Sequence, residues 1–141
     1  MTLEKRLEKR GYSDDEAIRA ILGEAEGESR EGKQAIGEVI RRRGSLKGVY
    51  GGNAIIQDGD RFYRKGKKGN RPISDKAVKE TRDSWESSKS SDYSRGSTHW
   101  QSDEDLNKTG WDKDKRFTNN GRIGAHTFLL ENRLKTRAKG A

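Results

Sequence analysis

Apolar residues recur at positions i, i+3 and i+4 in three segments, as in helices that bury one face. The first set is Ala17, Ile18, Ile21, Leu22 and Ala25, the second is Ala35, Ile36, Val39 and Ile40, and the third is Ala77, Val78, Thr81 and Trp85. Each set follows a serine suited to a helix N-cap: Ser13, Ser29 or Ser74. The spacing therefore predicts helices over about residues 13–27, 29–44 and 74–87.

The remaining segments show weaker patterns. "TLEKRLEKRG" predicts a short basic helix over residues 1–11, and the glycine-rich stretch 44–72 predicts a loop with a short strand near 54–63. Residues 87–121 are polar with isolated aromatic residues, before the last apolar run, "GRIGAHTFLL". We expect one domain over residues 1–141, of α+β class and mainly helical, with short strands or long polar loops.

Charge narrows the range of partners. The chain has 31 Lys and Arg against 23 Asp and Glu, a net charge of +8, which favours attraction to polyanions such as nucleic acid, anionic membranes or an acidic wall polymer. It has no cysteine, which excludes disulfides and thiolate chemistry. No apolar run has the length of a signal peptide or a membrane span, so we expect no membrane insertion.

Three carboxylates gather where the first helix ends, at Glu24, Glu26 and Glu28. A carboxyl at the end of a buried helix can be partly desolvated, which favours its protonated form and suits a general acid that cleaves a glycosidic bond. Glu24 is the best placed, because it follows the buried Ile21 and Leu22 closely. The alternative interpretation is that all three are solvated surface acids.

Other candidate chemistry has less support. His99 and His126 together with a glutamate could bind zinc, but they lack the HExxH spacing, and a packed histidine is the more frequent case. The basic loop 63–71 could follow a phosphate backbone but has few aromatic residues for base stacking. There is no GxSxG or P-loop motif, and we expect neither a metal nor a cofactor.

Several motifs together resemble the SleB-type cell wall hydrolases, relatives of spore-cortex-lytic enzymes. They are "AIRAILGEAEGESREGKQAIGEVI", "DYSRGSTHWQS", Trp111 and "RIGAHTF", and the likeness spans about residues 15–130. Glu26 and Arg42 stand where that family usually has Arg and Asn. The resemblance implies a lysozyme-like α+β fold and cleavage of peptidoglycan glycan strands. It assigns the catalytic role to Glu24, a supporting role to Glu28, and places near the glycan groove His99, Trp100, Trp111 and His126.

The resemblance implies a lytic transglycosylase that acts between N-acetylmuramic acid and N-acetylglucosamine. A hydrolytic muramidase with the same acid and Glu28 as second carboxylate stays open, as do a small basic nucleic-acid-binding protein and a zinc amidase using the histidines. We expect a monomer whose partners are glycan strands and the anionic cell envelope, with no nucleic acid. Without a signal peptide, it would be made in a host cytoplasm and act on the cell wall or periplasm, as an endolysin or a virion-borne lysin.

Overall fold

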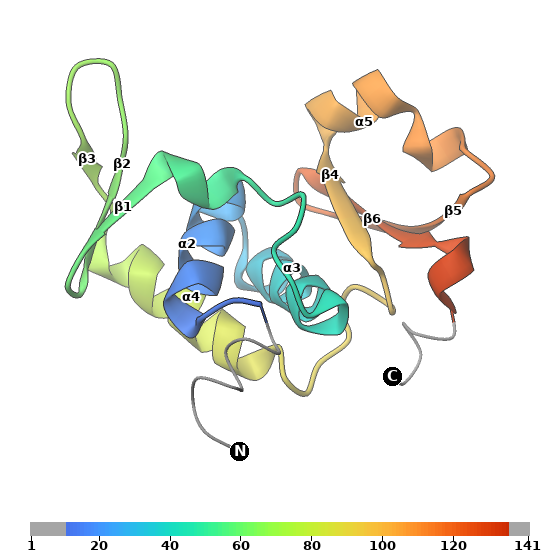
Figure 1. The fold of residues 1–141 in the computed structure, drawn as a ribbon, viewed down its shortest axis with the longest axis horizontal. Coiled ribbons are helices and arrows are strands. Elements are labelled where there is room, and N and C mark those ends of the chain that lie inside the picture. The colour runs from blue at the N-terminus through green and yellow to red at the C-terminus, as the bar shows by residue number, and fades with distance from the viewer. Residues whose placement is uncertain (1–10, 136–141) are drawn as a thin grey trace.

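Three helices form the centre of the protein, α2 (Asp14–Ala25), α3 (Arg30–Arg43) and α4 (Asp75–Ser87), in the computed structural model, which describes residues 11–135 (Figure 1). Their positions confirm the three helices predicted from the periodicity. The predicted basic helix over residues 1–11 falls almost wholly outside the described residues.

Serine side chains begin all three helices. Ser13 Oγ accepts a hydrogen bond from Glu16 N, and Glu16 Oε1 accepts one from Ser13 N, each at 3.1 Å, so the predicted capping box is present. Ser29 and Ser74 accept from Gly32 N and Ala77 N. Each bond satisfies a backbone N–H that has no partner inside its helix, which fixes where the helix begins.

The core lies where these helices meet. All nine apolar residues predicted for the first two helices are buried, as are Val78 and Trp85 of α4. The Trp85 indole lies edge-on to Tyr12, with ring centroids 5.8 Å apart, and the guanidinium of Arg41 lies 3.7 Å from its centroid. Burial of these faces supplies the main stabilisation of a chain that has few apolar residues.

The glycine-rich stretch forms more structure than the sequence predicted. A short 3-10 helix, η1 (Gly51–Ala54), leads into an antiparallel sheet of β1 (Ile55–Asp58), β2 (Arg61–Arg64) and β3 (Arg71–Pro72). The predicted single strand near 54–63 is in fact a hairpin, because Gly59 has a φ of +63° and turns the chain.

A second antiparallel sheet has the order β4–β6–β5, with β4 at His99–Ser102, β5 at Phe117–Ile123 and β6 at His126–Glu131. The 3-10 turns η2 (Trp111–Lys113) and η3 (Asn132–Leu134) flank β5 and β6. Helix α5 (Asp103–Thr109) follows β4 and was not predicted, because Leu106 is its one apolar residue. Its ends are set locally: Ser102 caps its start, and Gly110, with a φ of +66°, ends it.

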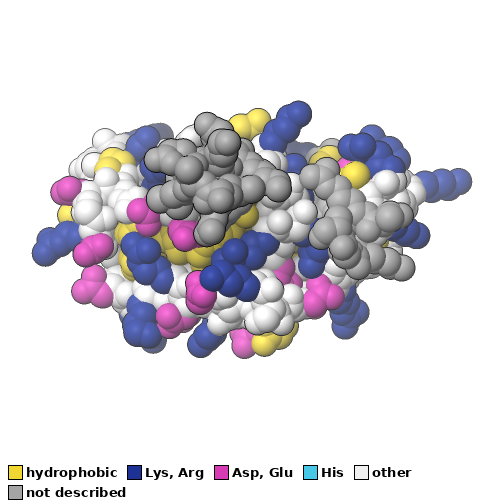
Figure 2. All heavy atoms as spheres, turned by 60° about the horizontal axis from the view of Figure 1, so that its bottom comes forward, with side chains coloured by type: hydrophobic (Ala, Val, Ile, Leu, Met, Phe, Trp, Pro, Cys, Tyr) yellow, Lys and Arg dark blue, Asp and Glu magenta, His cyan; other side chains and the backbone are white. Residues whose placement is uncertain are grey.

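The helices stand between the two sheets, with the β1–β2–β3 sheet at one end of the long axis and the β4–β6–β5 sheet at the other (Figure 1). The structure is a small single-domain α+β fold, as predicted. On the face drawn in Figure 2, Lys and Arg side chains are interspersed with Asp and Glu rather than gathered in one basic stripe. No helix within residues 11–135 combines the length and apolar character needed to cross a bilayer.

Candidate active site

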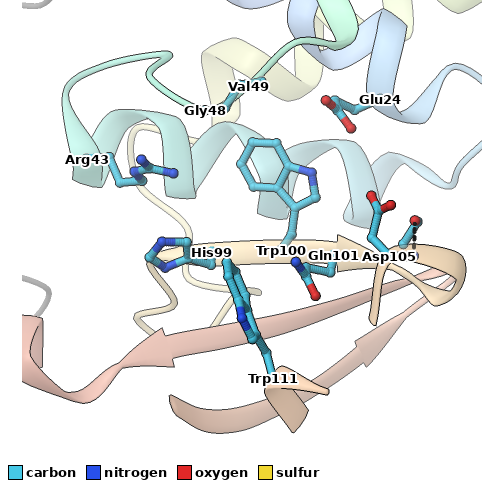
Figure 3. A pocket seen from close by; sticks show the side chains of 10 residues that line it. Glu24, Arg43, Gly48, Val49, His99, Trp100, Gln101, Asp105 and Trp111 are labelled. Carbon is cyan, nitrogen blue, oxygen red and sulfur yellow. Dashed lines mark hydrogen bonds between the residues drawn. The ribbon is translucent and has the colours of Figure 1, made fainter. Parts of the chain in front are cut away.

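Glu24 lies at the edge of a hollow between the helical centre and the β4 sheet (Figure 3). The hollow has a volume of about 280 Å³. Besides Glu24, the described lining residues are Arg43, Gly48, Val49, His99, Trp100, Gln101, Ser102, Asp105 and Trp111. The structure thus brings four of the predicted site residues together: Glu24, His99, Trp100 and Trp111.

A close backbone approach fixes the Glu24 carboxylate. Gly51 N donates a hydrogen bond of 3.0 Å to Glu24 Oε1. A Cβ on Gly23 would collide with the Gly51 carbonyl, so α2 and η1 can meet this closely only where glycine stands. Among residues 11–135 no ion pair joins Glu24 to a cation. Its carboxylate is held in place yet still faces the hollow.

Glu26 has a different environment, although it is two residues away. It accepts hydrogen bonds from both terminal nitrogens of Arg71, at 2.7 and 2.9 Å, and from Arg64 Nε at 2.9 Å. Hydrogen bonding to Arg71 holds the pKa of Glu26 below its ordinary value, with Arg64 adding to the lowering and burial opposing it. Arg64 also donates to the Leu22 carbonyl at the end of α2. Glu26 is therefore an ionised side chain that links the end of α2 to strands β2 and β3.

Glu28 links the helices to the second sheet through polar contacts. Its Oε1 accepts a hydrogen bond from Ala125 N at 2.7 Å and lies 3.2 Å from His126 Nδ1. A Cβ on Gly124 would collide with Glu28 Oε1, and the φ of +60° there also favours glycine. Glu28 and His126 line a second hollow, of about 510 Å³, which shares Glu24 and Ser102 with the first. Glu24 and Ser102 thus line both hollows, and the two hollows are together called the groove.

Aromatic rings form one wall of the first hollow. The His99 ring lies edge-on to Trp111 and Phe117, with centroids 5.6 and 5.5 Å apart, and those two rings stack on each other at 4.5 Å. Burial lowers the pKa of His99, Arg43 and Arg133 lower it further, and Glu131 opposes them. This lowering of the pKa favours the neutral form of the His99 ring. Such a wall suits stacking against the apolar face of a sugar ring.

The sequence did not single out Asp105 and Arg43 as site residues. Asp105 projects from α5 toward the hollow, across from Glu24, and Arg43 lies at the far end beside His99 (Figure 3). Asp105 has the pattern of an ordinary acid in the first turn of a helix, and Arg43 that of a basic residue in the last turn. Only the packing of β4 against α3, and of α5 against β4, gives them a shared position.

Arg42, which stands where SleB-type hydrolases usually have Asn, supports the loop before β4. Arg42 donates to Ser94 Oγ at 3.2 Å and to the Ser97 carbonyl, and it pairs with Asp92 at 3.2 Å. The buried Glu38 accepts from Ser94 N at 2.8 Å in the same loop. Two charged residues of α3 therefore hold the chain that delivers His99 and Trp100 to the site.

The two histidines lie at opposite ends of the paired strands β4 and β6. His99 pairs with Leu129 and His126 with Ser102, so three residues, about 10 Å, separate them along the ladder. Because this separation is an odd number of residues, the two side chains point to opposite faces of the sheet, and a single metal ion cannot bind both. Within residues 11–135, no group of three or more His, Cys, Asp or Glu side chains is placed to hold a metal ion.

Comparison of the chain with protein-family models, with curated proteins and with solved structures found no match. The likeness to SleB-type hydrolases therefore stays a prediction that rests on the quoted motifs.

Proposed function

We propose that this protein cleaves the glycan strands of peptidoglycan, with Glu24 as the general acid, and that it acts as a lytic transglycosylase. The observation that carries the proposal is the position of Glu24 in the groove. Of the three clustered acids, Glu26 is paired with two arginines and Glu28 with His126 and Ala125 N, whereas Glu24 faces a hollow walled by aromatic rings. A groove with an aromatic wall and a carboxyl that lines both of its hollows suits a carbohydrate.

In this mechanism, Glu24 in its protonated form donates the proton to the oxygen between N-acetylmuramic acid and N-acetylglucosamine. The bond from that oxygen to C1 of N-acetylmuramic acid breaks, and positive charge develops on the ring. The Glu24 carboxylate then takes the proton of the C6 hydroxyl, whose oxygen bonds to C1 and closes a 1,6-anhydro ring. The Gly51 N–H holds the carboxylate in position for both proton transfers.

Asp105 favours a second candidate outcome, hydrolysis. It lines the same hollow as Glu24 from the opposite side (Figure 3). Inverting glycosidases place a second carboxylate across the scissile bond, where it takes a proton from a water molecule whose oxygen attacks C1. Glu28 was the candidate from sequence for this role, but its Oε1 is occupied by Ala125 N and His126. Asp105 is therefore the better placed second carboxylate.

Digestion of purified peptidoglycan tests the proposal. Wild type should release fragments, and Glu24→Gln, which keeps the shape and can still accept from Gly51 N, should lose activity by about 100- to 10,000-fold. Glu31→Gln, a change of an exposed acid in the first turn of α3, is the matched control and should cleave like wild type.

Mass spectrometry of the fragments separates the two outcomes. Anhydro-muropeptides that persist in Asp105→Asn indicate the transglycosylase. Products heavier by one water that disappear in Asp105→Asn indicate the hydrolase. If wild type releases nothing, or Glu24→Gln matches wild type, the proposal is wrong.

A further inference from the structure

A third hollow adjoins the one that contains Glu24, on the side where His99 lies. It has a volume of about 470 Å³ and shares Arg43, Gly48 and His99 with its neighbour. Small-molecule sites have volumes of about 300–1,000 Å³, so the hollow is large enough for one unit of a ligand. Figure 3 shows His99 at the opposite end of the first hollow from Glu24. A group bound in the third hollow therefore lies away from the bond at which Glu24 would act.

The contacts of Thr98 decide which nitrogen of the His99 ring carries the proton. Thr98 Oγ1 accepts a hydrogen bond of 2.9 Å from Glu131 N and lies 2.9 Å from His99 Nδ1. Thr98 is buried, and the proton of a buried hydroxyl needs an acceptor. Among residues 11–135, His99 Nδ1 is the one acceptor in contact with this hydroxyl. Thr98 therefore donates to Nδ1, and the neutral ring carries its proton on Nε2.

The Nε2–H group of His99 lies near a carboxylate without bonding to it. Nε2 is 3.9 Å from Glu131 Oε2, which is longer than a hydrogen bond. Glu131 Oε1 accepts from Arg133 Nε, and within the described part of the chain neither Nε2 nor Oε2 has a hydrogen-bond partner. Both side chains line the third hollow and are 18% exposed, so a ligand there can reach them. The hollow thus presents a donor and an acceptor side by side, each held by a further contact.

This pair matches a single hydroxyl group. A hydroxyl accepts one hydrogen bond and donates another, so one oxygen about 2.8 Å from each atom satisfies both across the gap. A carboxylate or phosphate would accept from His99 but would be repelled by Glu131, and an ammonium group would pair with Glu131 but offers no acceptor to His99. Sugars carry hydroxyls around a ring whose face packs on aromatic side chains, and the stacked rings of Trp111 and Phe117 lie edge-on to His99.

We infer that His99 and Glu131 form a subsite that binds one hydroxyl of a sugar unit away from the cleaved bond, with Thr98 as a positioning residue. His99 Nε2 donates to the hydroxyl oxygen, and the hydroxyl donates its proton to Glu131 Oε2. The inference rests on the proposed function, because a further sugar reaches the third hollow only if a glycan strand lies in the groove. Since the subsite is remote from the reacting atoms, it contributes to the affinity for the strand and not to the chemical step.

Calorimetric binding of soluble glycan strands, from which an amidase has removed the peptide stems, tests the inference. The full chain with Glu24→Gln is the parent, so that affinity is measured without cleavage. His99→Phe keeps an aromatic ring but removes the donor, His99→Gln restores an N–H donor, and Glu131→Gln removes the carboxylate. Glu86→Gln changes the net charge as Glu131→Gln does, at an exposed position near the end of α4, and is the matched control.

His99→Phe and Glu131→Gln should each weaken binding by about threefold to tenfold, the effect of about one lost hydrogen bond. His99→Gln should recover part of the loss, and Glu86→Gln should bind like the parent. With Glu24 restored, the two site variants should raise KM by the same factor and leave kcat unchanged within about twofold.

NMR of the imidazole nitrogens tests the geometry without a change at the subsite. In the parent at a pH where the ring is neutral, Nδ1 of His99 should have the ¹⁵N shift of an unprotonated nitrogen and Nε2 that of a protonated one. Addition of the strands should shift the Nε2 signal. Because the measurement needs no variant of His99 or Glu131, it decides the question even if those variants unfold.

Unchanged affinity in both site variants overturns the inference, as does a proton on Nδ1 of His99. An equal loss of affinity in Glu86→Gln and Glu131→Gln would assign the effect to net charge and would overturn it too. Cleavage by wild type, with the same KM in His99→Phe and Glu131→Gln, would leave the proposed function standing and remove the subsite. Strand binding that depends on both residues, without any cleavage by wild type, would do the reverse.

Discussion

Replacing Gly51 by alanine should separate the activity of this protein from its stability. A Cβ at this position would lie 2.7 Å from Cγ, 2.8 Å from Oε1 and 2.9 Å from Cδ of Glu24. Ordinary carbon contacts are about 3.5–4.0 Å, so the carboxylate has to move by about 1 Å. Gly51 does not have a positive φ, so its backbone accommodates alanine without strain.

The expected magnitudes follow from that displacement. A misplacement of about 1 Å in a reacting group can cost about 100-fold in rate, so kcat on peptidoglycan should fall by about that factor. The side chain of Glu24 is flexible and gives way, and the hydrogen bond from Gly51 N is weakened. The free energy of unfolding should therefore fall by no more than about 2 kcal/mol, with part of the loss offset because alanine restricts the unfolded chain.

Gly52→Ala is the matched control. A Cβ there would lie 3.4 Å from Ala20 N and 3.5 Å from Ala20 Cα, which are ordinary contacts, and it would not approach Glu24. Its stability should stay within about 0.5 kcal/mol of wild type, with unchanged activity. Thermal unfolding and release of soluble fragments from peptidoglycan measure the two quantities. Full activity in Gly51→Ala, or an equal loss in Gly52→Ala, would refute the role of Gly51 in positioning the acid.

Three further predictions concern the supporting contacts. Gly124→Ala should lower the free energy of unfolding by about 3 kcal/mol, because φ is +60° and the new Cβ displaces Glu28, as denaturant titration would show. Since folding lowers the pKa of Glu26, its stabilising contribution is present above the ordinary value of 4.5 and is lost as the pH falls. Thermal unfolding of wild type should therefore lose more stability between about pH 7 and about pH 3 than that of Glu26→Gln. Burial and neighbouring cations lower the pKa of His99, so its NMR titration midpoint should lie below 6.5.

A specific result would contradict each of these three predictions. Gly110, with a φ of +66° and no atom within 4 Å of a built Cβ, supplies the control for Gly124, and equal losses at both would show that backbone strain alone acts. Parallel stability curves for wild type and Glu26→Gln would mean that the arginine pairs contribute nothing. A titration midpoint of His99 at or above 6.5 would show that its ring is more exposed to solvent than its packing indicates.

Local sequence determined the three central helices and their buried faces. Spacing at i, i+3 and i+4, a serine at each start and Gly44 at the end of α3 act within a few residues of one another, so they can be recognised without knowledge of the fold. Helix α5 was missed because it buries no continuous apolar face, and its caps alone gave too weak a signal. The hairpin was reduced to one strand because its turn depends on a single glycine, Gly59.

The sequence also indicated the cluster of three carboxylates at the end of the first helix and favoured Glu24 among them, but it could not predict the different environments of the three acids. Glu26 meets Arg64 and Arg71, which lie 38 and 45 positions along the chain, and Glu28 meets Ala125, 97 positions away. Asp105 and Arg43 come to the groove in the same way, through the packing of the second sheet on the helices. Periodicity and capping report interactions within one or two helical turns, whereas these contacts exist only once distant segments have packed together. For that reason, the three central helices of this protein could be predicted from its sequence, whereas the tertiary structure decided which partners each of its charged residues contacts.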